Sequence, residues 1–223
     1  MESINLYYDA FIFDMDGTLV NSEPLKGQAL ALTCKDYGSI VDYCIYQHVM
    51  GMKWENVVQY FFKIGGIEPD VQEFNDKFKE HYQSLLSHKL SINKGVVELL
   101  KQLKSSGKQC AVVTSAQQWM ANQILKDCKL EHLFDLVIAK EDVSMHKPDP
   151  EAYLLALSRL NVTADKAIIF EDSAPGLQAG LASGCEVIAF QHSFNINNDF
   201  SRALEIIDDF SVVSCQLRPK FSP

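Results

Sequence analysis

Short apolar runs alternate with amphipathic segments along most of the chain. The run at 10–13 (AFIF) is apolar throughout and bounded by polar residues, which predicts a fully buried strand. Similar runs recur after residue 95, and segments with apolar residues at helical spacing lie between them. This alternation predicts a parallel sheet covered by helices on both faces. The later predicted strands are 109–114, 134–139, 166–170 and 186–190, and the predicted helices are 95–107, 116–128, 149–160 and 174–184.

The segment 23–88 has a different pattern. Two stretches, 55–65 and 71–89, have helical spacing, a Gly-Gly pair lies between them, and the segment shows no convincing strand. We therefore expect an α/β fold, in which a Rossmann-like, doubly wound parallel sheet carries a helical insert. The predicted domains are a core of 1–20 plus 91–223 and an insert of 21–90.

Composition and charge narrow the possible partners. The 223 residues are 47% hydrophobic and 22% charged, as in ordinary globular proteins. The net charge is -9, whereas proteins that bind nucleic acids or anionic membranes are more often basic, so we expect neither partner. An anionic substrate would need local positive groups or a metal. The apolar runs are too short to span a bilayer, and the first residues do not resemble a signal peptide.

The cysteines favour a reducing compartment. Six cysteines are scattered along the chain without a C-x-x-C pair, so we expect no zinc site of the usual spacing. A chain of this length forms a core without disulfides, and we interpret the cysteines as reduced thiols. The expectation is a monomeric, cytoplasmic protein.

Polar side chains gather where the predicted strands end. In open α/β sheets, ligands bind in the crevice beyond the carboxyl ends of the strands. We therefore expect acids, hydroxyls and one lysine to meet at a single edge of the sheet. These residues are Asp14 and Asp16, Thr114 and Ser115, Lys147, and Glu171 and Asp172.

This set of side chains is suited to phosphoryl transfer. The carboxylates would repel one another without a cation, and hard oxygen ligands without His or Cys favour Mg²⁺. Lys147 and the Thr114 hydroxyl are suited to bind phosphate oxygens. Asp14 can then attack phosphorus to form an aspartyl-phosphate. Asp16 can protonate the leaving group and deprotonate the incoming water.

Each pair alone also has an ordinary structural interpretation. The first two aspartates could form a calcium loop or a solvated turn, although the segment lacks the further acids of an EF-hand. Thr114 could cap the helix that follows it, and Glu171 or Asp172 could cap the helix that begins near Ala174. Lys147 alone would be an ordinary surface lysine. The joint occurrence of these residues at the ends of successive predicted strands favours a functional site over the separate structural interpretations.

Four motifs resemble those of the haloacid dehalogenase superfamily. DMDGTLV resembles its first motif, and VVTSA, HKPDP and IIFEDSAPGLQA resemble the second, third and fourth, in the same order and strand placement. The resemblance covers essentially the whole chain, because the helical insert is similar to a C1-type cap. It implies that Asp14 is the nucleophile and Asp16 the acid/base. It also implies Mg²⁺ ligands at Asp14, the Asp16 backbone carbonyl and Asp172, with Glu171 bound directly or through water.

Further segments resemble the phosphatase and β-phosphoglucomutase-like branch: MDGTLVNSEPL, KPDPE and FEDSAPGLQAG. This resemblance implies a Mg²⁺-dependent phosphatase whose substrate is a small phosphorylated metabolite. The mutase pattern has a histidine near the hinge and an arginine after the cap's glycine. Here Lys26 and Trp54 lie near those positions, with Lys53 beside Trp54, and lysine does not reproduce the arginine fork. We therefore expect net phosphate release, with Lys26 and Trp54 as candidate contacts for the leaving group.

Three other functions stay open at this point. They are a phosphomutase, a catalytically idle binding protein, and a dehalogenase, which would lack the second aspartate and need no metal. Asn21 and Lys94 depart from the branch pattern, where aspartate and proline are commoner. Trp54 has an alternative interpretation as a packing residue in the hydrophobic core of the cap. His146 is interpreted as the only histidine near the site and is given no role.

Overall fold

The computed structural model describes residues 7–216 and forms two compact units. The first unit contains the described parts of Met1–Val20, Ile92–His192 and Asn198–Pro223, and the second contains Asn21–Ser91 and Ser193–Asn197. The sequence analysis placed residues 193–197 in the core, whereas the structure groups them with the helical unit. The two chain ends and the side chain of Cys215 lie outside the described residues.

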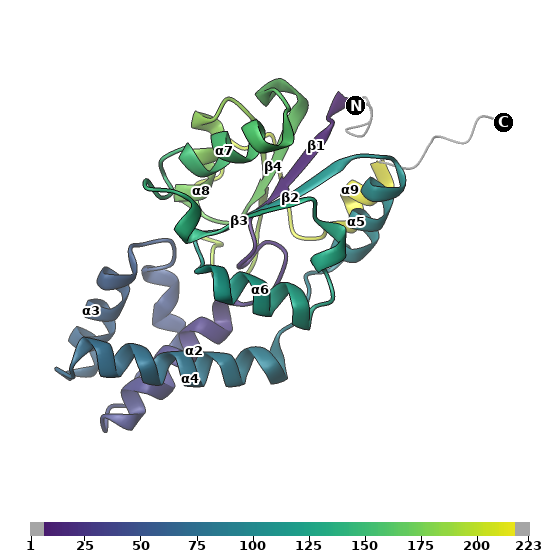
Figure 1. Cartoon of the computed structure of the whole chain (residues 1–223). Coiled ribbons are helices and arrows are strands. Elements are labelled where there is room, and N and C mark those ends of the chain that lie inside the picture. Colours follow the sequence, from purple (N-terminus) through teal and green to yellow (C-terminus); the bar gives the residue numbers. More distant parts are fainter. Residues whose placement is uncertain (1–6, 217–223) are drawn as a thin grey trace. The chain divides into compact units, whose positions relative to one another are not determined.

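A six-stranded sheet forms the centre of the first unit (Figure 1). Its order is β3-β2-β1-β4-β5-β6, and every pairing is parallel, which confirms the predicted α/β, doubly wound class. The sixth strand was not predicted. The strands are β1 (Ala10–Phe13), β2 (Gln109–Val113), β3 (Leu136–Ile138), β4 (Ala167–Glu171), β5 (Glu186–Phe190) and β6 (Glu205–Ile207).

Helices cover both faces of this sheet, with α7 and α8 on one side and α5 and α9 on the other (Figure 1). The last of these helices was not predicted. The helices are α5 (Val96–Ser105), α6 (Gln118–Asp127), α7 (Glu151–Leu160), α8 (Ala174–Ala182) and α9 (Ser211–Gln216). Short 3₁₀ turns are η2 (Glu131–Leu133), η3 (Lys140–Asp142) and η4 (Ala164–Lys166).

The central strand β1 is buried on both faces, so its alternate side chains belong to two apolar layers. Ala10 and Ile12 join the cluster that includes Tyr153 of α7. On the other face, the ring of Phe13 stacks on Phe170 at 4.8 Å between centroids. All four residues of β1 have an exposed fraction of 0%. This packing on both faces fixes the position of the residue that follows the strand.

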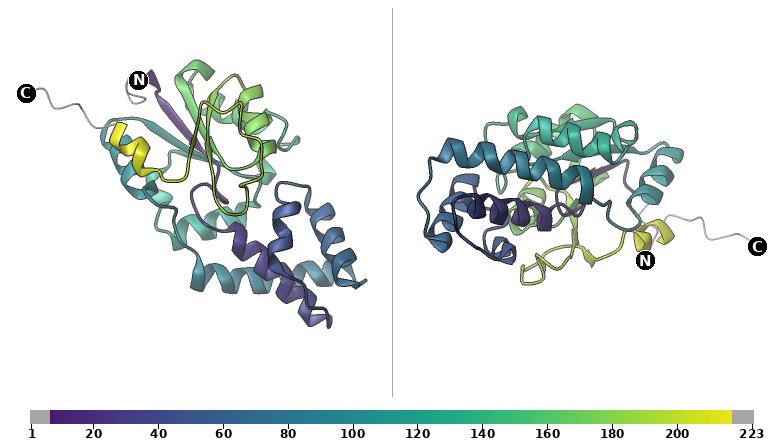
Figure 2. Two further views of the ribbon diagram at one scale, coloured as in Figure 1. Left: turned by 180° about the vertical axis from the view of Figure 1, so that it is seen from behind. Right: turned by 90° about the horizontal axis from the view of Figure 1, so that it is seen from below.

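The second unit is helical. Two of its helices have the predicted positions, and α2, which packs against α4, was not predicted as a separate element (Figure 2). Aromatic rings join α3 to α4, including Trp54 and Phe78 at 4.5 Å between ring centroids. The helices are α2 (Glu23–Asp36), η1 (Tyr43–His48), α3 (Trp54–Gly65) and α4 (Val71–Lys89).

The segment Ser193–Asn197 packs as part of this helical unit. The ring of Phe194 stacks on Tyr43 of η1, with 6.2 Å between centroids. Asn195 is buried, with an exposed fraction of 1%. The unit is therefore assembled from two separate stretches of the chain.

Lys94, which stands where the resemblance leads us to expect proline, joins two parts of the first unit. Its Nζ lies 2.6 Å from Oδ2 of Asp209, and its backbone carbonyl accepts a hydrogen bond from Phe210 N at 2.9 Å. The hydrogen bond from Lys94 lowers the pKa of Asp209 to about 2. Lysine therefore ties the start of α5 to the segment that leads into α9.

The five cysteines whose side chains are described are free thiols. Burial raises the pKa of Cys34 to about 11 and that of Cys110 to about 12, so these thiols are poor nucleophiles at neutral pH. Between residues 7 and 216, none of the helices has the length and apolar character needed to cross a membrane.

Candidate active site

The carboxyl ends of three neighbouring strands bring four predicted residues to one edge of the sheet. Asp14 follows β1, Thr114 follows β2, and Glu171 and Asp172 lie at the end of β4. Because β1 lies between β2 and β4, these ends are adjacent. All four side chains are buried, with exposed fractions of 7% or less. Buried polar groups need partners, and the structure supplies them.

Three of the carboxylates form a compact group. Asp14, Glu171 and Asp172 each offer an oxygen, and these oxygens lie within 4.8 Å of one another. Burial raises the pKa of Asp14 well above its usual range; Lys147 opposes this shift, while the two neighbouring carboxylates add to it. Such a group favours a bound cation, and its all-oxygen donors fit the Mg²⁺ expected from the sequence.

Lys147 enters this group from the loop between β3 and α7. Its Nζ donates to Asp14 Oδ1 and Glu171 Oε1, each at 2.6 Å, and to the Val113 carbonyl at 3.0 Å. The side chain is only 6% exposed. Burial lowers the pKa of Lys147, but the two carboxylates raise it by more, so the pKa stays well above its usual range. Lys147 is therefore positively charged, and its ammonium group holds the carboxylates of Asp14 and Glu171.

Each of the two carboxylate oxygens of Glu171 accepts more than one hydrogen bond. Besides Lys147, Oε1 accepts from the Tyr153 hydroxyl at 2.9 Å. Oε2 accepts from Asp172 N at 2.9 Å and from the backbone N and the hydroxyl of Ser173, each at 3.1 Å. Gly176 lies so close that a side chain there would collide with this carboxylate. The arrangement favours Glu171 as the anchor of Lys147 and leaves Asp14 and Asp172 better placed as metal ligands.

Tyr153 is a site residue that sequence reasoning missed. It lies on α7 within an apolar helical pattern, so the sequence suggests only a core residue. In the structure its hydroxyl reaches Glu171, and Lys147 Nζ lies 5.0 Å from its ring centroid. The ring therefore packs against the same ammonium group that its hydroxyl helps to anchor.

The structure removes two helix-capping alternatives. Ser173 is the N-cap of α8, and its side chain accepts from Gly176 N at 3.1 Å, so neither acidic neighbour caps that helix. The N-cap of α6 is Gln117. The Thr114 hydroxyl instead accepts from Ala116 N at 3.0 Å, and Ser115 is exposed. Thr114 is therefore buried at the site, whereas the Ser115 side chain faces solvent.

Asp16 lies in the turn after β1. Gly17 has φ +83, and Gly17 N donates to the Val20 carbonyl at 2.8 Å, which closes the turn. The carboxylate of Asp16 is half-buried and, among the described residues, is not one of the three grouped acids. The acid/base role expected for Asp16 stays a prediction.

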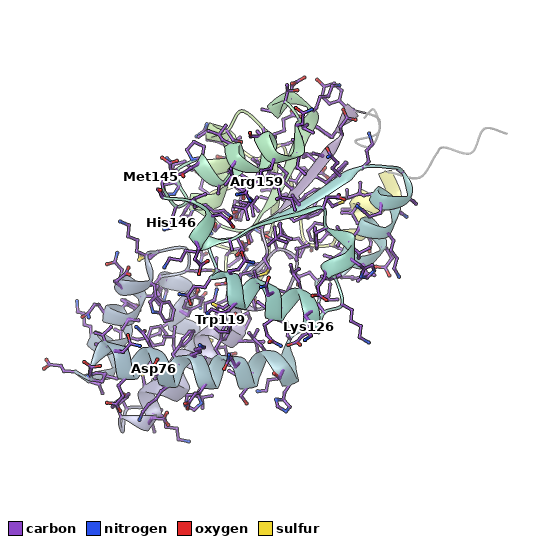
Figure 3. All side chains as sticks on the ribbon, viewed as in Figure 1. Asp76, Trp119, Lys126, Met145, His146 and Arg159 are labelled. Carbon is purple, nitrogen blue, oxygen red and sulfur yellow. The ribbon has the colours of Figure 1, made fainter. Side chains whose placement is uncertain are left out.

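A histidine that the sequence analysis missed contacts the acidic group. His192 Nε2 lies 2.9 Å from Oδ2 of Asp172. The interpretation of His146 as the only histidine near the site is therefore wrong. His146 is exposed on the loop before α7, beside Met145 (Figure 3). The available signal was positional, because His192 follows β5 as the other site residues follow their strands.

The two candidate substrate residues lie in the helical unit. Lys26 Nζ is 2.7 Å from Oε1 of Glu23, one helical turn earlier. Trp54 donates from Nε1 to Asn75 Oδ1 at 2.9 Å and packs on Phe78. These contacts give Trp54 a packing role within its own unit. A role toward substrate stays a prediction for both.

Comparison with known proteins places this site in a family. The model of haloacid dehalogenase-like hydrolases matches residues 11–190. The chain is 34% identical over 188 residues to a phosphorylated carbohydrates phosphatase of Thermotoga maritima, covering 84% of this chain and 87% of that protein. It is 28% identical to the fructose-1-phosphate phosphatase YqaB of Escherichia coli, covering 81% and 95% of the two chains.

Solved structures agree with this relationship. A candidate β-phosphoglucomutase from Thermotoga maritima superimposes with a TM-score of 0.80 at 31% identity, covering 93% of this chain and 97% of that chain. The family match includes the strand ends that carry Asp14, Thr114 and Asp172. The chain therefore belongs to the haloacid dehalogenase-like hydrolases.

Proposed function

We propose that the protein is a Mg²⁺-dependent phosphatase that hydrolyses small phosphomonoesters, sugar phosphates in particular. The observation that carries this proposal is the buried lysine that bridges Asp14 and Glu171 beside Asp172. The names of the relatives, phosphatases of phosphorylated carbohydrates and of fructose 1-phosphate, support the substrate class. The cap role of the helical unit and the individual residue roles are part of the same proposal.

The chain's own residues suffice to write both half-reactions. An oxygen of Asp14 attacks phosphorus as the ester P–O bond breaks, and Asp16 gives its proton to the departing alkoxide. Water then attacks the aspartyl-phosphate, Asp16 takes the water's proton, and inorganic phosphate leaves. Lys147 and the Thr114 hydroxyl bind phosphoryl oxygens. Held by Asp14, Asp172 and the Asp16 backbone carbonyl, Mg²⁺ would offset the charge on those oxygens.

A phosphomutase is the second candidate, because the solved Thermotoga maritima relative is described as a candidate β-phosphoglucomutase. A mutase returns the phosphate to the sugar, whereas a phosphatase releases it. We expect incubation with β-glucose 1-phosphate, Mg²⁺ and a bisphosphate primer to give free phosphate faster than glucose 6-phosphate. The reverse order would favour the mutase, with Lys53, the neighbour of Trp54, as the candidate phosphate anchor.

Removal of metal should stop the reaction. On a panel of sugar phosphates and other small phosphomonoesters, we expect phosphate release that falls at least about 100-fold in excess chelator and returns with added Mg²⁺. The grouped acids explain this dependence, because they need a cation before substrate phosphate can bind beside them. Full activity in chelator would contradict the metal role. A complete lack of turnover across the panel would favour the idle binding protein.

Replacement of Asp16 should discriminate between leaving groups. We expect Asp16→Asn to slow hydrolysis of a sugar phosphate by roughly 10² to 10⁴-fold, because an alkoxide leaving group needs a proton. An activated aryl phosphate needs little protonation, so its loss should be much smaller. The measurement is kcat/KM on both substrates. Asp9→Asn is the matched control, because Asp9 is an exposed aspartate at the other end of β1. Equal losses on both substrates would refute the acid/base role.

A further inference from the structure

We propose that His192 is a positioning residue that holds the Asp172 carboxylate in the orientation needed to bind the divalent cation. This inference rests on the proposed function, because it concerns the same metal. His192 lies two residues beyond β5 (Glu186–Phe190), at the same edge of the sheet as the acidic group. Its Nε2 lies 2.9 Å from Oδ2 of Asp172, and the two side chains are 14% and 5% exposed.

Gly17, in the turn that follows β1, packs against the contact between His192 and Asp172. Gly17 lies so close that a side chain there would collide with Oδ2 of Asp172, and its Cβ would stand 3.0 Å from His192 Nε2. The ring of Phe190 lies 6.5 Å from the His192 ring, measured between centroids. The imidazole therefore occupies a confined position against the turn that carries Asp16. Gly17 is required here for the approach of the pair as well as for its positive φ.

The chemistry of the contact explains how the imidazole orients Asp172. An ionised carboxylate only accepts hydrogen bonds, so the Nε2–H form of the imidazole donates to Oδ2. The other oxygen, Oδ1, lies 3.5 Å from the Thr18 hydroxyl, which is a weak contact. The stronger contact at Oδ2 therefore restrains rotation of the carboxylate. Hydrogen-bond partners behind a ligand commonly change metal affinity by about 10 to 100-fold.

The test is the Mg²⁺ affinity of the full-length protein, measured by titration calorimetry without substrate. The variants are His192→Leu, His192→Gln and His192→Asn. A glutamine amide can place its nitrogen near the position of Nε2, whereas the shorter asparagine reaches only that of Nδ1. We expect His192→Leu and His192→Asn to weaken Mg²⁺ binding at least about 10-fold, and His192→Gln to stay within about threefold of wild type.

Controls separate positioning from structure. His132→Leu makes the same change at an exposed histidine of η2, which precedes β3 and so lies at the opposite end of the sheet, and its affinity should equal wild type. Asp172→Asn should abolish the measured binding, which ties the signal to this site. Unfolding in denaturant and chelator reports the structural contribution independently. If His192 only packs, the variants lose stability while their Mg²⁺ affinity does not change.

Specific outcomes would overturn the inference. Wild-type Mg²⁺ affinity in His192→Leu would do so, as would equal effects of glutamine and asparagine. If the leucine variant fails to fold, the comparison of glutamine with asparagine decides. A wild-type protein that binds no Mg²⁺ would overturn the metal role in the proposed function, and this inference with it. A wild-type protein that binds Mg²⁺ with variants that bind equally well would overturn the inference alone.

Discussion

Asp14→Asn is expected to reduce phosphate release by at least about 10³-fold, because an amide of nearly the same shape replaces the proposed nucleophile. The carbonyl oxygen of the new amide can still accept from Lys147 Nζ, which donates to Oδ1 of Asp14 at 2.6 Å. The substitution therefore removes reactivity while it preserves the local geometry. The measurement is single-turnover phosphate release with Mg²⁺ present, with Asp9→Asn as the control.

The stability of this variant has an expected sign. Burial, opposed by Lys147 and reinforced by the neighbouring acids, raises the folded-state pKa of Asp14 above its usual value. A group with a raised pKa stabilises the fold when protonated, and that stabilisation is lost as pH rises through the folded pKa. At neutral pH the neutral amide should therefore leave the free energy of unfolding in chelator unchanged or higher. In the single-turnover assay, phosphate release by Asp14→Asn above a few per cent of the wild-type rate would refute the assignment of Asp14 as the nucleophile.

Lys147→Met should be the most destabilising single substitution at this site. The ammonium group contacts Asp14 and Glu171 at 2.6 Å, and its side chain is 6% exposed. Its removal leaves buried carboxylates without their charged partner, which typically costs about 3–5 kcal/mol. We expect that loss in the free energy of unfolding in chelator, partial recovery with Mg²⁺, and loss of phosphatase activity.

A matched surface pair supplies the control for Lys147. Lys104 and Asp135 are also 2.6 Å apart, but their side chains are 31% and 37% exposed. Exposed pairs are screened by solvent, so Lys104→Met should cost no more than about 1 kcal/mol. Urea unfolding of both variants makes the comparison. Similar small losses for both would show that Lys147 does not neutralise the acids in the folded protein.

The elements that could be predicted are those whose own sequence carries the signal. β1 is an unbroken apolar run because both of its faces are buried, and α4 shows a clear apolar stripe. The edge strand β6 has only three residues, and Ile206 is 48% exposed. It is a strand because it pairs with β5, a long-range contact that local pattern does not encode. α2 was missed because its buried residues include small ones such as Gly27 and Ala29, which form no strong stripe.

The site residues also divide into those with a local sequence signal and those that depend on long-range contacts. Asp14, Thr114 and Asp172 were predicted because they directly follow apolar strands whose carboxyl ends meet. Tyr153 lies in a helix whose pattern indicates only packing, and its hydroxyl reaches Glu171 because α7 covers that part of the sheet. His192 follows the predicted strand 186–190 by two residues, which places it at the same edge of the sheet, but its contact with Asp172 became known only from the fold. Residues that support others are therefore harder to predict than residues that end strands.

The two-part composition of the helical unit constrains how it could be exchanged between relatives. Tyr43 stacks on Phe194, and Asn195 is buried, although the second stretch of this unit follows β5, far along the chain from the first. A chimaera that replaces only Asn21–Ser91 would set Phe194 against a foreign surface. A compatible graft must carry Ser193–Asn197 as well. Recombination at a single pair of junctions would therefore separate side chains that fit one another, so point substitution should be a more accessible route to variation in this unit than transfer of the unit between relatives.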